Sequence, residues 1–180
     1  MYYKKILAAA LTVSCIGGIV PANSVQAASL KIRYSGKTRY YKGKQLHVSY
    51  ANKNLSSKYV GIQINKVNMI PYYDYLVKQG PKVKRTYSKS SGKLILKNGD
   101  DTLTAYVGKR TYYLNGIKKT FSVAPTKVKY YKTKKTIILI PANAIVKGLG
   151  LNYKYSSSSK RIYITQPVIP SDSTTQAQTQ

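Results

Sequence analysis

Two eleven-residue phrases with the same outline stand seventy positions apart in the chain, IPYYDYLVKQG and IPANAIVKGLG. Both begin with Ile-Pro and end with Gly, and apolar residues recur between these ends at helical spacing. Pro71 and Pro141 suit the first helical position, where the missing N–H is not needed. Gly80 and Gly150 suit a left-handed cap at the end of a helix. Each phrase therefore predicts a strand, a short helix and a stop.

Short strand-like segments separated by turn residues surround the two phrases. Asn115-Gly116 is the strongest of these turn signals, because both residues tolerate positive φ. Tyr, Val, Ile and Thr, which favour strands, fill the flanking segments. The expected hairpins join residues 30–34 with 38–42, 82–87 with 93–97, 93–97 with 102–107, 110–114 with 117–122, and 151–155 with 161–165, with a further strand at 44–50.

A second pair of similar segments lies upstream of the two phrases, because GKTRYY at residues 36–41 resembles GKRTYY at residues 108–113. We therefore expect two tandem similar units, residues 28–98 and 99–166. A short helix cannot bury itself, so each helix must lie on a sheet. The predicted fold class is α+β, with antiparallel β-sheet or meander hairpins packed on short helices.

The two ends of the chain differ from this pattern. Residues 1–27 resemble a secretory signal peptide, with Lys4 and Lys5 before an apolar run and small residues at the cleavage point. The run of about 15 residues is shorter than the ~20 that span a bilayer, so we expect no transmembrane span after cleavage. Cys15 lies in this run, which leaves the exported chain without a disulfide. Residues 167–180 are rich in Pro, Ser, Thr and Gln and are expected to be a disordered tail.

The charge of the chain is strongly one-sided. Thirty-one Lys and Arg stand against four Asp and no Glu, and loss of Lys4 and Lys5 leaves 29 − 4 = +25. Twenty-six of the basic residues are Lys, a point charge that attracts polyanions without reading their shape. The alternative is that the lysines only keep an exported protein soluble, although +25 exceeds what solubility requires.

The sequence offers little for catalysis or metal binding. Copper and zinc sites need several imidazole or thiolate ligands, and after cleavage His47 is the one such side chain. Each Asp has a structural interpretation: Asp74 in the first turn of a helix, Asp100 and Asp101 in a hairpin turn, Asp172 in the tail. No P-loop, dinucleotide fingerprint or nucleophile elbow occurs. We therefore expect no enzyme activity and no cofactor.

Tyrosine is the other abundant functional side chain, with 19 copies and no Trp. Tyr-Tyr pairs recur, and on a strand one member of a pair faces the core and the other faces solvent. Core packing accounts for most of them. Exposed Tyr among Lys could stack on sugars or single-stranded nucleic acid, but export argues against nucleic acid as the main ligand. The candidate residues for polyanion or glycan binding are Tyr41, Tyr113, Tyr131, Lys37, Lys109, Lys129 and Lys132.

A series of short motifs resembles the copper amine oxidase N-terminal-like domain, also called the stalk domain. They are Leu114-Asn115-Gly116, Val123-Ala124-Pro125, Lys135-Thr136-Ile137, Leu139-Ile140-Pro141 and Leu149-Gly150. The resemblance covers most of residues 86–165 and, more loosely, residues 30–85. The Arg that often follows the Pro phrase in this family is missing, since Asn143 stands nearby.

The resemblance implies an antiparallel sheet wrapped on a helix and a non-catalytic role, because in amine oxidases this domain is an appendage that does not hold the copper. Together with the charge, it predicts an exported binding module of a Gram-positive-type bacterium. The expected partner is the anionic cell wall, teichoic acid or peptidoglycan, with no specific nucleic acid. The alternatives are a purely structural stalk and an orphaned targeting domain of a cell-wall amidase.

Overall fold

The computed structural model describes residues 29–168, and the expected signal peptide and most of the expected tail lie outside the described residues. Strands make up 53% of the described residues and two short helices accompany them, which confirms a broadly α+β fold. The elements are β1 (Leu30–Tyr34), β2 (Lys37–Tyr41), β3 (Gln45–Tyr50), β4 (Lys53–Leu55), β5 (Gly61–Ile64), β6 (Val67–Pro71), η1 (Tyr73–Gln79), β7 (Lys84–Tyr87), β8 (Lys93–Asn98), β9 (Asp101–Tyr106), β10 (Thr111–Leu114), β11 (Ile117–Thr120), β12 (Thr126–Tyr130), β13 (Lys135–Pro141), α1 (Ala142–Gly148), β14 (Asn152–Ser156) and β15 (Arg161–Thr165).

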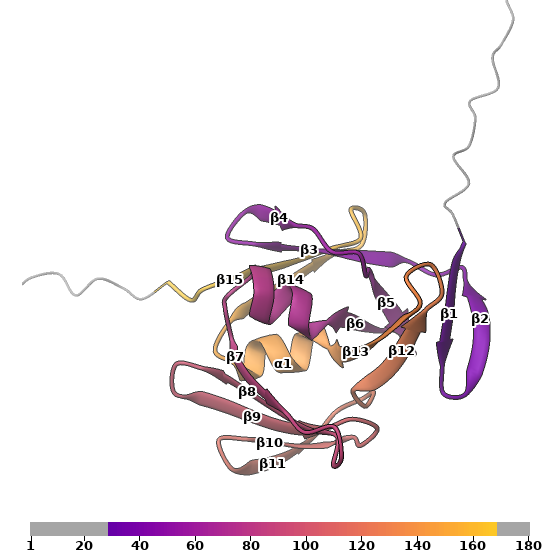
Figure 1. The fold of residues 1–180 in the computed structure, drawn as a ribbon. Helices are drawn as coiled ribbons and strands as arrows, with labels where there is room; N and C mark the ends of the chain where they lie inside the picture. Colours follow the sequence, from indigo (N-terminus) through magenta and orange to yellow (C-terminus); the bar gives the residue numbers. More distant parts are fainter. Residues whose placement is uncertain (1–28, 169–180) are drawn as a thin grey trace, which may run out of the picture.

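The strands form two sheets, and the two helices lie between them (Figure 1). The first sheet has ten strands in the order β14-β15-β3-β5-β6-β13-β12-β1-β2, with β4 paired to β3. The second has five strands in the order β11-β10-β9-β8-β7. The main core lies between the sheets and joins Leu46 and Ile162 of the first sheet to Leu94 and Leu103 of the second. A smaller core lies on the opposite face of the first sheet, around Ile32, Met69, Val128 and Leu139.

All five predicted hairpins are present with their partners. The Asn115-Gly116 turn has φ of 50° and 82°, so both residues adopt the positive φ that this turn requires. The β5–β6 hairpin was not predicted, although Asn65 and Lys66 form a turn of the same kind, with φ of 49° and 64°. Lys is an unusual residue at positive φ, so Asn65-Lys66 is not a clear turn signal.

One strand pair departs from the predicted antiparallel sheet. β15 pairs with β3 in parallel, with Ile162 opposite Val48. Residues more than a hundred positions apart make this pair, and no local signal in the sequence specifies it. The C-terminal strand therefore lies inside the first sheet, between β14 and β3.

Strand pairing also crosses the boundary expected between residues 98 and 99. β8 and β9, on either side of it, form one hairpin, and β1 pairs with β12. Each half of the chain contributes strands to both sheets.

The two similar phrases lie side by side and pair with each other. β6 and β13 are antiparallel neighbours, and Ile70 is the cross-strand partner of Ile140. Pro71 faces Leu139, and Pro141 faces Met69. The prediction that each proline occupies the first helical position is therefore wrong, because both prolines are the last residues of strands. Each lies at the end of the short β6–β13 ladder, where the lost N–H does least harm.

A short helix follows each proline, as predicted, but the two helices differ in kind. α1 is an α-helix with Ile145 and Val146 buried. η1 is a π-helix with Tyr75 and Leu76 buried. π-helical turns are rare, and no sequence pattern distinguishes them from α-helical ones.

The glycines at the ends of the helices play different roles. Gly150 has φ of +69°, and the N–H of Leu151 reaches the carbonyl of Val146, which confirms the predicted left-handed cap. Gly80 has φ of −80°, so the prediction of a left-handed cap there is wrong. A glycine is required at position 80 for another reason, because the carbonyl oxygen of Tyr75 occupies the space that a Cβ would need.

We therefore expect Gly80→Ala to destabilise the fold by more than 1 kcal/mol, because backbone must move to admit the methyl group. Gly150→Val should destabilise it by roughly 1 kcal/mol or more through positive φ. Gly116→Ala is the control, since φ is also positive there but nothing lies within 4 Å of the new Cβ. Urea unfolding measures all three. An effect of Gly80→Ala no larger than that of the control would contradict the steric explanation.

Candidate functional site

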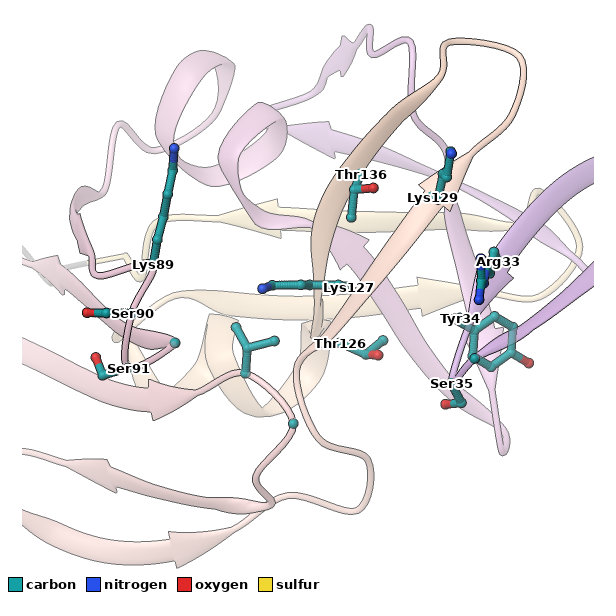
Figure 2. A pocket seen from close by; sticks show the side chains of 14 residues that line it. Arg33, Tyr34, Ser35, Lys89, Ser90, Ser91, Thr126, Lys127, Lys129 and Thr136 are labelled. Atoms are coloured by element: carbon teal, nitrogen blue, oxygen red, sulfur yellow. The ribbon is translucent and has the colours of Figure 1, made fainter.

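A basic cleft of about 680 Å³ opens between the two sheets. Four regions distant in sequence form it (Figure 2): the β1–β2 hairpin, the loop between β7 and β8, the turn after β9 at Val107 and Gly108, and strand β12 with its neighbour β13. The cations that line it are Arg33, Lys89, Lys127 and Lys129. Among the 14 residues that line it there is no carboxylate. The cleft therefore presents only positive charge.

Strand alternation places three of these cations. Ile32 and Val128 are fully buried in the smaller core, so their neighbours Arg33, Lys127 and Lys129 point to the opposite, exposed face. Arg33 and Lys129 are direct cross-strand partners. Like charges directly opposite each other destabilise a sheet. An anion bound between the two strands would remove this cost.

Hydroxyl groups line the same cleft. Ser90 and Ser91 come from the β7–β8 loop, and Thr126 and Thr136 come from β12 and β13. Figure 2 shows Lys127 reaching across the cleft toward the serine loop. Phosphate and carboxylate groups accept hydrogen bonds from ammonium and hydroxyl groups. The cleft gathers both kinds of donor around one open space.

A ladder of alternating Lys and Tyr continues from the cleft across the outer face of β12, β1 and β2. Lys129 Nζ lies 5.4 Å from the ring centre of Tyr131, and Lys31 Nζ lies 5.0 Å from the same ring and 5.5 Å from that of Tyr40. These distances are typical of cation–π contacts. The ladder holds the ammonium groups of these lysines at the surface, where they can bind an anion.

The hydroxyl group of Tyr131 is affected by this environment. It lies 2.9 Å from the hydroxyl of Thr38. This hydrogen bond lowers the pKa of Tyr131, and the nearby positive charges of Lys129, Arg33 and Lys31 lower it further. The hydrogen bond and the three positive charges thus act in the same direction, and both favour negative charge at this face.

The tyrosine pair on β10 follows the predicted alternation of inward and outward side chains, and the pair at the start of η1 is also divided between core and solvent. Tyr72, Tyr112 and Tyr130 are buried, whereas Tyr73 and Tyr113 are exposed. In the first pair the expected assignment is wrong: Tyr40 is 59% exposed. The hydroxyl of Tyr41 instead points inward, accepts a hydrogen bond from the Gln63 N–H at 2.8 Å and donates one to the Lys44 carbonyl at 3.0 Å. Tyr40, and not Tyr41, belongs to the exposed ladder.

The other predicted binding residues are dispersed. Lys129 lines the cleft, and Tyr131 lies beside it. Tyr113 belongs to the second sheet, Lys109 lies over Tyr106, and the remaining predicted lysines are Lys37 at the start of β2 and Lys132 after β12. The sequence did not single out Arg33, Lys89 or Lys127. The alternation of Lys around Val128 in TKVKY was a signal for Lys127, whereas nothing local indicated Lys89.

Possible metal ligands are sparse in the described part of the chain. No group of three His, Cys, Asp or Glu side chains comes together within residues 29–168. His47 is exposed on β3, as expected for a surface strand residue. Asp74 lies in the first turn of η1, as predicted, and accepts a hydrogen bond from Ser57.

We expect the purified protein to bind copper no more tightly than a single surface histidine does, because one imidazole without neighbours makes a weak site. Isothermal titration with copper would measure this, with His47→Ala as the comparison. Stoichiometric micromolar binding that disappears in His47→Ala would contradict the prediction.

Within residues 29–168, neither helix has the length and apolar character needed to cross a membrane.

Comparison with known protein families identifies the family of this chain. The sequence model of the copper amine oxidase N-terminal domain matches residues 50–164, and the chain belongs to this family. Searches of curated proteins and of solved structures gave no significant match. The N-terminal domain of this family is non-catalytic, and the chain is consistent with a stalk module. The match includes Lys89, Lys127 and Lys129 of the cleft and begins after β1 and β2, so Arg33 and, of the Lys–Tyr ladder, Lys31 and Tyr40 lie outside it.

Proposed function

We propose that this protein is an exported, non-catalytic module that associates with the anionic bacterial cell wall, teichoic acid or peptidoglycan, through its Lys- and Tyr-rich surface. The observation that carries the proposal is the basic cleft, in which four cations and several hydroxyl groups face one open space with no carboxylate among its lining residues. Family membership supports the non-catalytic part of the proposal.

The energetics of the cleft favour a polyanion over a purely structural role. Arg33 and Lys129 stand opposite each other, with Lys127 on the same strand as Lys129. A stalk that binds nothing gains no stability from this arrangement, since each like-charge neighbour opposes folding. A phosphate polymer would neutralise several of these charges at once and release its counterions, which favours binding at low salt.

The salt dependence of wall binding tests the proposal. Retention on purified walls should fall steeply between low and physiological salt, because released counterions drive the association. For duplex DNA the slope is about 0.9 per neutralised phosphate, and we carry over the form of this law and not its coefficient. Walls stripped of their anionic polymer should lose most of the bound protein.

A pair of variants with the same change in charge localises the binding. Lys127→Gln with Lys129→Gln should weaken retention by roughly tenfold and reduce the salt slope, because both side chains line the cleft. The matched control is Lys118→Gln with Lys119→Gln, on the exposed edge strand β11 of the other sheet. Retention that is independent of salt, or that survives removal of the anionic polymer, would favour the stalk interpretation. Equal effects of the two double variants would assign binding to overall charge.

A further inference from the structure

A second cavity, of about 380 Å³, lies next to the basic cleft and has a different character. Three tyrosine rings, Tyr59, Tyr72 and Tyr73, line it together with Asp74 and the first half of β13. We refer to it as the tyrosine pocket. Among its lining residues Asp74 is the one carboxylate and Lys135 the one cation, so its charges are balanced, whereas the lining of the cleft is only basic.

The pocket exists because β13 is longer than its partner. β6 pairs with residues 139–141 of β13 and ends at Pro71, after which the chain turns into η1. Residues 135–138 of β13 pair with β12 alone. The chain from Pro71 to Asp74 therefore diverges from β13, and the space between them is the tyrosine pocket.

The ring of Tyr73 is the exposed surface of this pocket. It is 45% exposed, and the guanidinium of Arg85 lies 4.7 Å from its ring centre. Tyr72 meets it edge to face at 6.4 Å. Burial raises the pKa of Tyr72, an effect that nearby Arg85 partly offsets, so this hydroxyl stays protonated and can donate a hydrogen bond. A fixed aromatic face beside hydroxyl donors is suited to the apolar face and polar rim of a sugar ring.

Asp74 adds an acceptor to the same pocket. Its Oδ2 atom accepts a hydrogen bond from Ser57, which fixes the carboxylate in place. A carboxylate repels phosphate but accepts hydrogen bonds from hydroxyl groups. Because Asp74 balances Lys135, the tyrosine pocket has no excess positive charge to hold a second anion and is suited to a neutral polyol or sugar.

The two cavities meet at Thr136, which lines both of them. Figure 2 shows Thr136 on β13 close to Lys129 of the cleft. Thr136 is exposed, and Lys129 is its cross-strand partner. A ligand that leaves the basic cleft over Thr136 thus enters the tyrosine pocket without crossing buried structure.

We propose that the cleft and the tyrosine pocket form one track that binds a glycosylated phosphodiester polymer, with a phosphate among Lys127, Lys129 and Arg33 and an attached sugar on Tyr73 and Asp74. This inference rests on the proposed wall binding and names the part of the wall that is recognised. Single-stranded nucleic acid also combines phosphates with rings that stack on tyrosine, but the proposed export of the protein argues against it as the ligand.

Binding of two matched polymers tests the track. Poly(glycerol phosphate) with and without attached glucose would be titrated against the whole protein at fixed salt, with single-stranded poly-dT as a third ligand. We expect the glucosylated polymer to bind about tenfold more tightly than the bare one. Tyr73→Ala and Asp74→Asn should each remove this preference without weakening binding of the bare polymer. Tyr73→Phe should keep it, since the ring face remains.

Control variants separate the parts of the track. Lys127→Gln with Lys129→Gln should weaken both polymers by the same factor, and Tyr113→Ala, at an exposed tyrosine of the other sheet, should leave the preference unchanged. Equal binding of the two polymers, an unchanged preference in Tyr73→Ala and Asp74→Asn, or tighter binding of poly-dT than of the glucosylated polymer would overturn the track and leave charge-driven wall binding standing. Failure of the wild-type protein to bind either polymer would overturn the track, and failure to bind purified walls as well would overturn both proposals.

Discussion

Separate expression of residues 29–98 and 99–168 is expected to give two chains that do not fold on their own. The first half would keep β1, β3 and β6 but lose their partners β12, β15 and β13. The main core would be divided as well, because Leu94 and Leu96 lie in one half and Leu103 and Ile140 in the other. Loss of this much buried apolar surface exceeds the few kcal/mol by which a domain of this size is stable. Circular dichroism and amide chemical-shift dispersion of each half would measure the result.

Mixing the two halves provides the control. If pairing across the 98–99 boundary is what each half lacks, an equimolar mixture should regain the spectrum and the cooperative melting of the intact chain. A half that melts cooperatively alone would show instead that the two units suggested by the sequence fold independently.

The second large effect is expected in alkali. Burial raises the pKa of Tyr75 to about 12, and it raises that of Tyr130 further. The unfolded chain releases these protons near pH 10, whereas the folded chain retains them, so the free energy of unfolding must fall as pH rises above 10. For Tyr75 alone, this difference in pKa between the unfolded and the folded chain lowers the free energy of unfolding by roughly 2 kcal/mol at pH 12. We therefore expect cooperative unfolding between pH 10 and 12, measured by circular dichroism with tyrosine ionisation followed by ultraviolet absorbance.

Substitution by phenylalanine isolates the tyrosine contribution from the lysines, which titrate over the same range. Tyr130→Phe loses the hydrogen bond from the hydroxyl to the Val60 carbonyl at 2.6 Å, so stability at pH 7 should fall by about 1 kcal/mol. Its stability should then decrease less between pH 10 and 12 than that of the wild type. Tyr113→Phe, at an exposed ring, should leave the pH dependence unchanged. An identical decrease in Tyr130→Phe and wild type would contradict the assignment.

Local signals predicted the hairpins well because each turn is determined by a few adjacent residues. Asn115-Gly116 specified its turn, and strand alternation placed Tyr112 inward and Tyr113 outward. The same reasoning misplaced Tyr40 and Tyr41. With two neighbouring tyrosines, strand alternation requires that one points inward and the other outward, but it does not say which. Pairing of β2 with β1 decides the phase, and it puts Tyr40 opposite Lys31 on the outer face.

Long-range contacts could not be read from the sequence. The parallel pairing of β15 with β3 joins segments that are more than a hundred residues apart. No feature of either segment's sequence indicates which strand it pairs with. The basic cleft has the same origin, since Arg33, Lys89 and Lys127 come from three separate regions. Composition correctly indicated a basic surface, but only the fold shows which lysines share one open space. The tyrosine pocket follows from the end of β6 at Pro71, which the sequence had assigned to a helix.

Pairing of Ile70 with Ile140 has a consequence for how this chain is built. Corresponding residues of the two phrases meet across a local two-fold axis, so the contact is isologous, the type that normally joins identical subunits. Here one polypeptide supplies both sides of it. The β6–β13 ladder therefore has the geometry of a homodimer interface within a single polypeptide, and the covalent connection between its two sides makes their association independent of protein concentration.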